Sequence, residues 1–136
     1  FLNRVSELVT LEQNIEWSRY LAEKHREHIS SRKLQILSSS LEIKETIKTN
    51  NFDFILIDGG DRKLAFDISN KNLKPGGLLI IDNLERFFYT GISSPEAVSA
   101  TLNEWKEIEK LIFSWRNFIS SNGIFQTGIF LKPCLE

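Results

Sequence analysis

Two short apolar runs, each ending in an acidic residue, constrain the fold of this 136-residue chain more than any other feature. The first lies in residues 52–60 (FDFILIDGG) and the second in residues 76–83 (GGLLIIDN). Short runs that are apolar at successive positions and bounded by glycine are typical of parallel strands buried between two layers of helices. Neither run has the regularly spaced polar residues of an amphipathic helix. We therefore expect both to be buried strands.

The segment between these runs, residues 61–74, predicts a helix. Its apolar residues at near-helical spacing are Leu64, Ala65, Ile68 and Leu73. Asp61 is a suitable N-cap, and Lys71 and Lys74 suit the negative end of the helix dipole. Residues 75–77 (PGG) are expected to end the helix and turn the chain into the next strand. A strand, a helix and a second strand in this order predict parallel pairing with a right-handed crossover.

The same alternation of strands and helices extends along the rest of the chain. The expected upstream elements are strands at residues 8–12 and 34–37 and helices at residues 14–29 and 41–49. The expected downstream elements are a helix beginning at Ser94 and strands at residues 112–119 and 126–131. Only the turn at residues 120–123 (SSNG) separates the last two strands, which predicts antiparallel pairing. The pattern predicts a single α/β domain over residues 1–136 with three layers, a mostly parallel sheet and an antiparallel C-terminal hairpin.

The charge balance and the apolar runs narrow the functional classes. With 17 basic and 18 acidic residues the formal charge is −1, which gives no electrostatic support for binding nucleic acid or an anionic membrane. The longest apolar runs, residues 54–57 and 78–81, are far shorter than the about 20 residues of a membrane-spanning helix. Cys134 is the only cysteine, which suits a reducing compartment, so we expect a cytoplasmic protein.

The residues that end the expected strands carry most of the functional information, because open α/β sheets bind ligands beyond the carboxyl ends of their strands. These residues are Glu12, Ser38 to Ser40, Asp58 to Gly60, and Asp82 with Asn83. A carboxylate at the position of Glu12 is suited to accept two hydrogen bonds from a ribose diol. The alternative is that Glu12 is an exposed acid that stabilises the N-terminus of the following helix. Unpaired carboxylates at a buried sheet end are costly, so the acids together indicate a binding partner.

The order and spacing of these motifs resemble a class I S-adenosylmethionine-dependent methyltransferase. Residues 73–83 (LKPGGLLIIDN) are the most telling stretch, and residues 52–60 resemble the strand before it. Residues 9–17 (VTLEQNIEW) resemble the family's second strand with its ribose-binding acid, and residues 127–133 (TGIFLKP) resemble its last antiparallel strand. The resemblance covers nearly all of the chain. It implies a Rossmann-like fold, S-adenosylmethionine as the cofactor and methyl transfer to a small-molecule substrate, with oxygen as the expected acceptor.

The resemblance also assigns cofactor-binding roles by position. Glu12 would hold the ribose hydroxyls, and Asn14 or Ile15 would lie near the adenine edge. Ser38 and Ser39 stand where the family often has an acidic residue that contacts the adenine amino group. This departure from the family pattern leaves the adenine contact open.

The expected reaction centre contains Asp58, Asp82 and Asn83 as catalytic residues, with Asp58 and Gly59 also beside the amino-acid part of the cofactor. These three residues match the oxygen ligands of Mg²⁺-dependent O-methyltransferases, in which a hard cation acidifies a substrate hydroxyl. Those enzymes carry a lysine three residues after the first aspartate, where this chain has Asp61, so a divalent metal is an alternative that we do not favour. For Asp82 and Asn83 the other alternative is capping of the following segment.

Further residues near the same strand ends have more than one interpretation. Arg62, Glu85 and Arg86 either bind a polar or anionic substrate or form ordinary surface ion pairs. Residues 87–89 (FFY) form a lid over the substrate, a dimer contact, or simple packing.

The tryptophans Trp17, Trp105 and Trp115 are expected in the core or as interface anchors. In the predicted helix at residues 14–29, Trp17 is expected to lie partly inward together with Ile15, Tyr20 and Leu21.

The family's glycine-rich turn is the one motif that the sequence does not contain, because no glycine precedes Gly59. We therefore expect an N-terminally truncated domain that lacks the family's first strand, and weak or no cofactor binding by the isolated chain. The alternative function is a non-catalytic scaffold or oligomerisation module with the same fold, which would be a homo-oligomer. A dehydrogenase has no positive support, because the Gly-x-Gly-x-x-Gly motif is missing.

Overall fold

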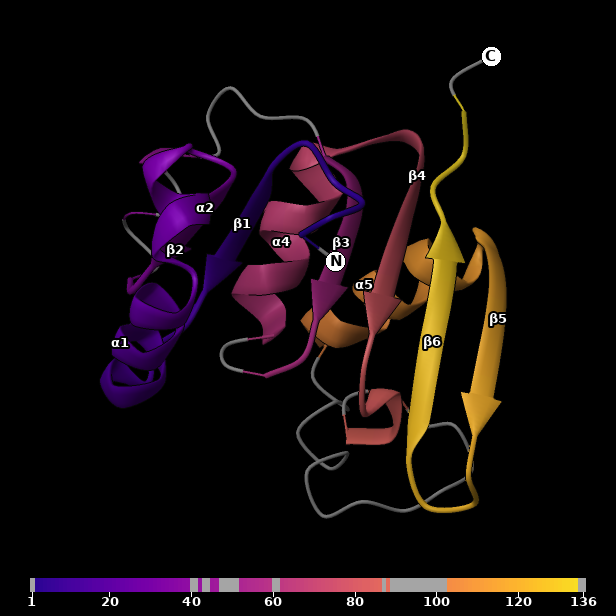
Figure 1. Cartoon of the computed structure of the whole chain (residues 1–136). Coiled ribbons are helices and arrows are strands. Elements are labelled where there is room, and N and C mark those ends of the chain that lie inside the picture. Colours follow the sequence, from indigo (N-terminus) through magenta and orange to yellow (C-terminus); the bar gives the residue numbers. More distant parts are fainter. Residues whose placement is uncertain are drawn as a thin grey trace. The chain divides into compact units, whose positions relative to one another are not determined.

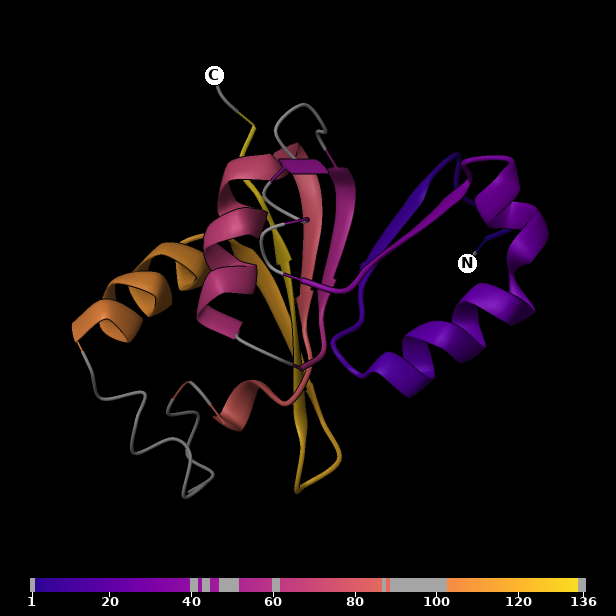
Figure 2. The same ribbon diagram turned by 90° about the vertical axis from the view of Figure 1, so that its left-hand side faces the viewer.

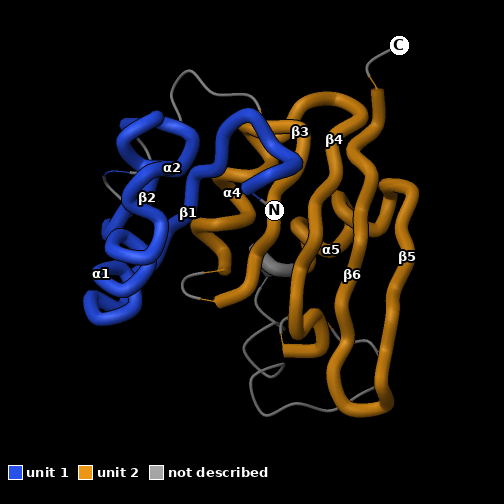
Figure 3. The backbone as a smooth tube through the Cα atoms, viewed as in Figure 1, with its two compact units in different colours: residues 1–50 blue, residues 51–136 orange. Residues whose placement is uncertain are grey.

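The computed structural model describes residues 2–39, 42, 45–46, 52–59, 62–86, 88 and 103–134, with the side chains of residues 103–105 left out. Figure 1 and Figure 2 show the ribbon from two sides. The chain divides into two compact units, residues 1–50 and residues 51–136, which Figure 3 colours separately. We describe each unit by itself.

The first unit is built on a two-stranded parallel sheet. Strand β1 (Leu8–Leu11) pairs in parallel with β2 (Leu34–Leu37) over their whole length. Helices α1 (Ile15–Lys24) and α2 (Arg26–Ser30) connect the two strands. Both predicted strands are confirmed, and the single predicted helix is divided at His25, whose backbone leaves the helical conformation. The helix predicted at residues 41–49 lies mostly outside the described residues.

The inward orientation predicted for the apolar side of α1 is wrong. Ile15, Trp17 and Tyr20 are 63%, 57% and 49% exposed, and only Leu21 of the predicted group is half-buried. Leu34 is the one buried residue among those described in this unit. The reason is physical: a sheet of two strands has little apolar surface with which to cover a helix.

The second unit contains a four-stranded sheet in the order β3-β4-β6-β5. Strand β3 (Phe52–Ile57) pairs in parallel with β4 (Leu73–Ile81), and α4 (Arg62–Asn72) connects them. This strand–helix–strand unit is the one that the two apolar runs predicted, and its parallel pairing is confirmed.

The C-terminal part adds an antiparallel hairpin to this sheet. Helix α5 (Asn103–Phe113) leads to β5 (Arg116–Ser121), which pairs antiparallel with β6 (Gln126–Leu131), and β6 also pairs antiparallel with β4. The predicted hairpin is confirmed, but its first strand begins four residues later than predicted, at Arg116 rather than residue 112. Residues 94–102, where the predicted last helix begins, lie outside the described residues.

The predicted boundary between α4 and β4 is wrong. The helix ends at Asn72, and Pro75, Gly76 and Gly77 lie inside β4 instead of between helix and strand. The register of the β3–β4 pairing shifts at these residues of β4, because Phe52 pairs with Leu73 whereas Phe54 pairs with Leu78. Gly76 has a φ of +74°, which favours glycine, and its N–H donates to the Lys132 carbonyl at 2.9 Å. The glycines therefore accommodate a strand irregularity rather than a turn.

Two further predictions concern the ends of α4. Lys74 belongs to β4 and not to the end of the helix, and its Nζ forms an ion pair with Asp53 Oδ1 at 2.7 Å. The N-cap predicted at Asp61 lies outside the described residues.

The core of the second unit lies between one face of the sheet and the helices α4 and α5, which Figure 2 shows on the same side. Phe130 and Leu79 from the sheet and Ile112 from α5 are fully buried there. Helix α4 contributes Phe66, whereas the predicted stripe residues Leu64, Ala65 and Ile68 are only half-buried.

Aromatic residues join the two layers of this core. The Phe113 ring contacts Phe88 and Phe130 edge-on, with centroid distances of 6.0 and 5.5 Å. Phe88 is buried, so packing is the correct interpretation for this residue, and Phe87 and Tyr89 lie outside the described residues. The predicted core position of Trp115 is confirmed.

Helices cover β3 less completely than its apolar sequence predicts. Phe54 and Leu56 are exposed, whereas Ile57 at the end of the strand is buried. The expected double-sided burial of this strand is therefore wrong within this unit, where both described helices lie on one face of the sheet. Nowhere in the described part of the chain is a helix both long enough and apolar enough to cross a bilayer.

Candidate functional site

Two acids follow neighbouring parallel strands at the same end of the sheet. Asp58 comes directly after β3 and Asp82 directly after β4. The last residues of these strands, Ile57 and Ile81, are paired, and the Asp82 N–H donates to the Ile57 carbonyl at 2.9 Å. The fold therefore brings these two predicted residues to adjacent positions at the carboxyl ends of the strands.

The Asp82 residue is held by two contacts from distant parts of the second unit. Its Oδ1 accepts a hydrogen bond from the Thr127 hydroxyl at 2.8 Å. Its backbone carbonyl accepts a hydrogen bond from Nη1 of Arg62, the first residue of α4. Both the side chain and the backbone of Asp82 are thus fixed in place.

The predicted surface ion pairs of Arg62 and Glu85 are wrong, because both residues are buried. Arg62 is 7% exposed, and Glu85, in the short 3₁₀ helix η2 (Leu84–Arg86), is 3% exposed. The Glu85 Oε2 accepts a hydrogen bond from the backbone N–H of Gln126 at 2.8 Å. Gln126 is buried as well, and its Oε1 has no hydrogen-bond partner among the described residues.

The surroundings of Arg62 act on its protonation in opposite directions. Burial is the largest influence on the pKa of the Arg62 guanidinium and lowers it from its ordinary value. Arg86 acts in the same direction through like-charge repulsion. Three carboxylates act in the opposite direction and favour the cation: Asp58, Asp82 and Glu85. The end of the sheet is therefore a cluster of charges of both signs.

Asn83 and Gly59 occupy turns next to the two acids. Asn83 is half-buried with a φ of +50°, and its carbonyl accepts a hydrogen bond from the Arg86 N–H at 3.1 Å, closing the turn that begins η2. Gly59 has a φ of +132°, a conformation that side chains rarely adopt, although a Cβ there would have open space around it. The requirement for glycine at this position is therefore conformational rather than steric.

In the first unit, the residues predicted at the cofactor cap the start of α1. Glu12 Oε1 accepts a hydrogen bond from the Asn14 N–H at 2.8 Å. Asn14 Oδ1 accepts from the N–H groups of Glu16 and Trp17 at 2.9 and 3.1 Å, which makes Asn14 the N-cap of α1. The neighbouring Ile15 points a largely exposed side chain into solvent.

Ser38 and Ser39 after β2 form a similar local arrangement. The Ser38 N–H donates to Glu42 Oε2 at 2.7 Å, and Ser39 Oγ accepts from the Glu42 N–H at 3.2 Å. The bond from Glu42 to Ser39 is one half of a capping box, whereas the Glu42 carboxylate accepts from the preceding Ser38 instead of from Ser39. The sequence SSLE at residues 39–42 has the spacing of this motif.

The structure therefore groups the predicted site residues in two sets. The second unit brings together Asp58, Gly59, Asp82 and Asn83, and the first unit holds Glu12, Asn14, Ile15, Ser38 and Ser39. Sequence reasoning missed Thr127 and Gln126, which no local motif marks and which only the β4–β6 pairing brings to Asp82 and Glu85. Within the described residues, no group of three or more His, Cys, Asp or Glu side chains is arranged to hold a metal ion.

No protein-family model and no curated protein matches the sequence, but solved structures do. The O-methyltransferase TomG from Streptomyces achromogenes, in complex with SAM, matches with a TM-score of 0.62 at 16% identity over 93% of this chain. The O-methyltransferase from Bacillus cereus, in complex with SAH, matches with a TM-score of 0.62 at 17% identity over 93% of this chain. The chain has the fold of the class I methyltransferases. The predicted Rossmann-like α/β class is thereby confirmed.

The chain spans 62% of the length of the TomG chain and 63% of that of the Bacillus cereus enzyme. At these identities the likeness to methyltransferases establishes the fold alone, because one fold can carry many different activities.

Proposed function

We propose that the chain belongs to an enzyme that transfers a methyl group from S-adenosylmethionine to an oxygen atom of a small molecule. One observation carries the proposal: Asp58 and Asp82 follow paired parallel strands in a fold shared with SAM-bound and SAH-bound O-methyltransferases. Ligands of such folds bind at this end of the strands. A cytoplasmic location is part of the same proposal.

On this proposal, residues of the first unit hold the adenosine part of the cofactor. Glu12 accepts hydrogen bonds from the ribose hydroxyls, and its bond to the Asn14 N–H uses only one of the about four acceptor positions of a carboxylate. The Ile15 side chain and the backbone of Asn14 contact the edge of the adenine ring. Ser38, which is exposed, and Ser39, which is half-buried, supply short polar groups for the adenine amino group.

The residues of the second unit then serve the methyl transfer. The cofactor supplies an electrophilic methyl group, and the acceptor oxygen attacks its carbon in line while the carbon–sulfur bond breaks. The Asp58 carboxylate takes the proton of the acceptor hydroxyl. Asp82, held by Thr127, and Asn83 orient the acceptor. Gly59 has no side chain and open space around it, which leaves the backbone beside Asp58 accessible to the cofactor.

The proposal is tested by titration calorimetry with SAH on the protein as its gene encodes it. We expect binding, with an affinity at least about 10-fold lower in Glu12→Ala, because about 1.4 kcal/mol of hydrogen bonding to the ribose is lost. Glu23→Ala, an exposed acid on α1, is the matched control and should bind as the wild type does. The absence of heat and of thermal stabilisation at millimolar SAH would contradict the proposal.

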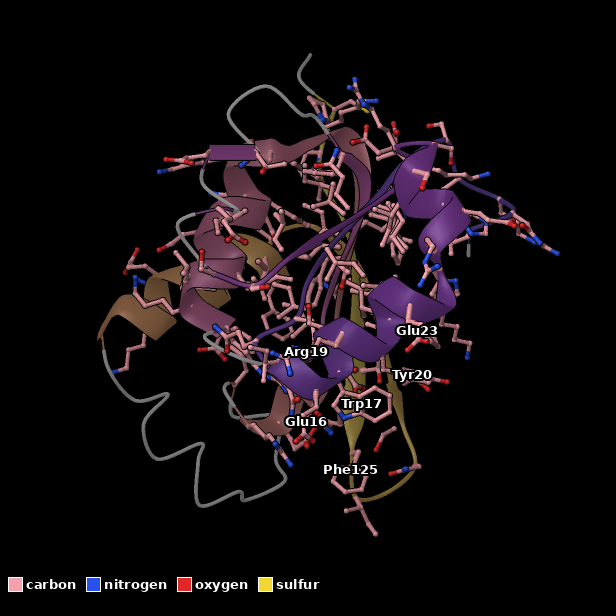
Figure 4. The ribbon with its side chains drawn as sticks, turned by 60° about the vertical axis from the view of Figure 1, so that its left-hand side comes forward. Glu16, Trp17, Arg19, Tyr20, Glu23 and Phe125 are labelled. Atoms are coloured by element: carbon pink, nitrogen blue, oxygen red, sulfur yellow. The ribbon has the colours of Figure 1, made fainter. Side chains whose placement is uncertain are left out.

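A second candidate function, a non-catalytic scaffold, is favoured by the exposed aromatic residues of α1. The rings of Trp17 and Tyr20, both labelled on α1 in Figure 4, contact each other edge-on with a centroid distance of 5.6 Å, and both side chains are exposed. Large exposed apolar groups are common at protein interfaces. Light scattering distinguishes the two functions, because the scaffold requires an obligate homo-oligomer, and a stable monomer that binds SAH leaves only the enzyme.

A further inference from the structure

Three carboxylates lie at the carboxyl end of the second unit's sheet, and one of them is buried. Asp58 and Asp82 are adjacent through the pairing of β3 and β4, with Asp58 exposed and Asp82 half-buried, whereas Glu85 is only 3% exposed. Carboxylates removed from water are strongly destabilising unless a positive charge compensates them. That charge comes either from a bound divalent ion or from a cationic side chain of the protein.

Arg62 meets this need from within the chain. It is 7% exposed, and its Nη1 donates to the carbonyl of Asp82, so the guanidinium is attached to the backbone at the end of β4. Its position at the start of α4, four residues after Asp58, places it beside both strand ends. The same guanidinium interacts electrostatically with Asp58, Asp82 and Glu85.

Two of the carboxylate oxygens around Arg62 already have protein donors. Asp82 Oδ1 accepts from the Thr127 hydroxyl and Glu85 Oε2 accepts from the Gln126 N–H, both at 2.8 Å. A magnesium ion requires about six oxygen ligands at about 2.1 Å in octahedral geometry. A fixed guanidinium repels such an ion, and the bonds from Thr127 and Gln126 restrict how the two carboxylates could turn toward it.

We propose that the Arg62 guanidinium is the resident cation of the strand-end acids and that this site therefore takes no divalent metal ion. The residues that match the ligands of Mg²⁺-dependent O-methyltransferases do not fit a metal here, because arginine supplies the charge. The catalytic meaning of the inference rests on the proposed function: Arg62 is then a positioning residue that holds the backbone of Asp82 and balances the charge of the neighbouring acids.

The test is binding of Mn²⁺, a spectroscopic probe for a magnesium site, followed by electron paramagnetic resonance on the gene-encoded protein. We expect the wild type to bind Mn²⁺ only weakly, with a Kd above about 1 mM. Arg62→Ala should remove the competing positive charge and bind one Mn²⁺ at least about 10-fold more tightly. Adding Asp58→Asn to Arg62→Ala should abolish the gain, and Arg116→Ala, an exposed arginine of β5, should not produce it.

Two results would overturn the inference. One is a single tight Mn²⁺ site in the wild type that Asp58→Asn removes, and the other is a folded Arg62→Ala variant without any gain in Mn²⁺ affinity. If Arg62→Ala does not fold, Arg62→Gln keeps an N–H donor for the Asp82 carbonyl without the charge and carries the same comparison. These measurements need no SAH, so their failure is distinguishable from failure of the proposed methyl transfer.

Discussion

The polar residues that follow the strands are held locally in the first unit and by distant residues in the second. Glu12, Asn14 and Ser39 accept hydrogen bonds from backbone N–H groups two or three residues away. Asp82 and Glu85 accept theirs from residues 45 and 41 positions away. The side chains with local hydrogen bonds remain near solvent. The carboxylates of Asp82 and Glu85, which are bound by distant residues, are half-buried and buried.

This difference predicts that the hydrogen bonds of the two units contribute differently to the free energy of unfolding. An N-cap contributes about 1 kcal/mol, because it satisfies N–H groups that water would otherwise reach. A buried charged group whose partner is removed costs several times more, because water cannot replace the partner. Substitutions of these residues should therefore lower the free energy of unfolding more in the second unit than in the first.

The largest effect is expected for Glu85→Ala. This change leaves the Gln126 N–H without its acceptor and removes one carboxylate from the neighbourhood of Arg62. We expect a loss of about 3–5 kcal/mol in the free energy of unfolding, measured by urea denaturation. Glu85→Gln retains an acceptor oxygen and should lose less. A loss below about 1 kcal/mol in Glu85→Ala would show that the burial of this charge has little energetic importance.

A smaller effect is expected for Thr127→Val, which removes the hydroxyl that donates to Asp82 Oδ1 and preserves the shape of the side chain. Hydrogen bonds to charged groups contribute about 1.5–3 kcal/mol, and Thr127 is only half-buried, so we expect a loss of about 1.5 kcal/mol. Thr127→Ser keeps the donor and should behave nearly as the wild type in the same urea titration. Equal losses in the two variants would mean that the methyl group, and not the hydroxyl, is important.

The first unit should respond more weakly. Asn14→Ala removes the acceptor for the N–H groups of Glu16 and Trp17, and we expect a loss of about 1 kcal/mol together with lower helicity by far-ultraviolet circular dichroism. Asn14→Ser keeps a capping oxygen and should restore most of both signals. A loss as large as that of Glu85→Ala would break the ranking between the two units.

The smallest effect is expected for Lys74→Ala, which removes an ion pair with Asp53 between exposed side chains. Exposed ion pairs contribute about 0.5 kcal/mol and are screened by salt. The difference from the wild type should therefore disappear at about 0.5 M NaCl. A salt-independent loss above about 1 kcal/mol would show that Lys74 stabilises β4 in another way.

Strands β3 and β4 could be predicted from the sequence because each contains a short apolar run followed by an acidic residue. The start of β4 could not, because proline and glycine at residues 75–77 usually end a helix, whereas here a register shift places them within a strand. The exposure of Trp17 could not either, because helical spacing does not reveal how much sheet surface is available to cover it.

The candidate site divides in the same way. Asp58 and Asp82 could be placed together from the sequence, because neighbouring parallel strands end at one edge. The burial of Arg62 and Glu85 could not be predicted from the sequence. Thr127 and Gln126, which donate to Asp82 and Glu85, reach the site only through the pairing of β4 with β6. The contact between Ser39 and Glu42 could be predicted from the sequence, because the two residues are three positions apart.

The tryptophan side chains of the two units lie in different environments, so intrinsic fluorescence can monitor each unit. Trp17 in the first unit is open to water and Trp115 in the second is buried, so their fluorescence should differ in emission maximum and in quenching by acrylamide. With Trp105 changed to phenylalanine, each remaining indole follows one unit. A denaturation curve recorded at two emission wavelengths would then reveal whether the two units unfold in a single cooperative step or one after the other.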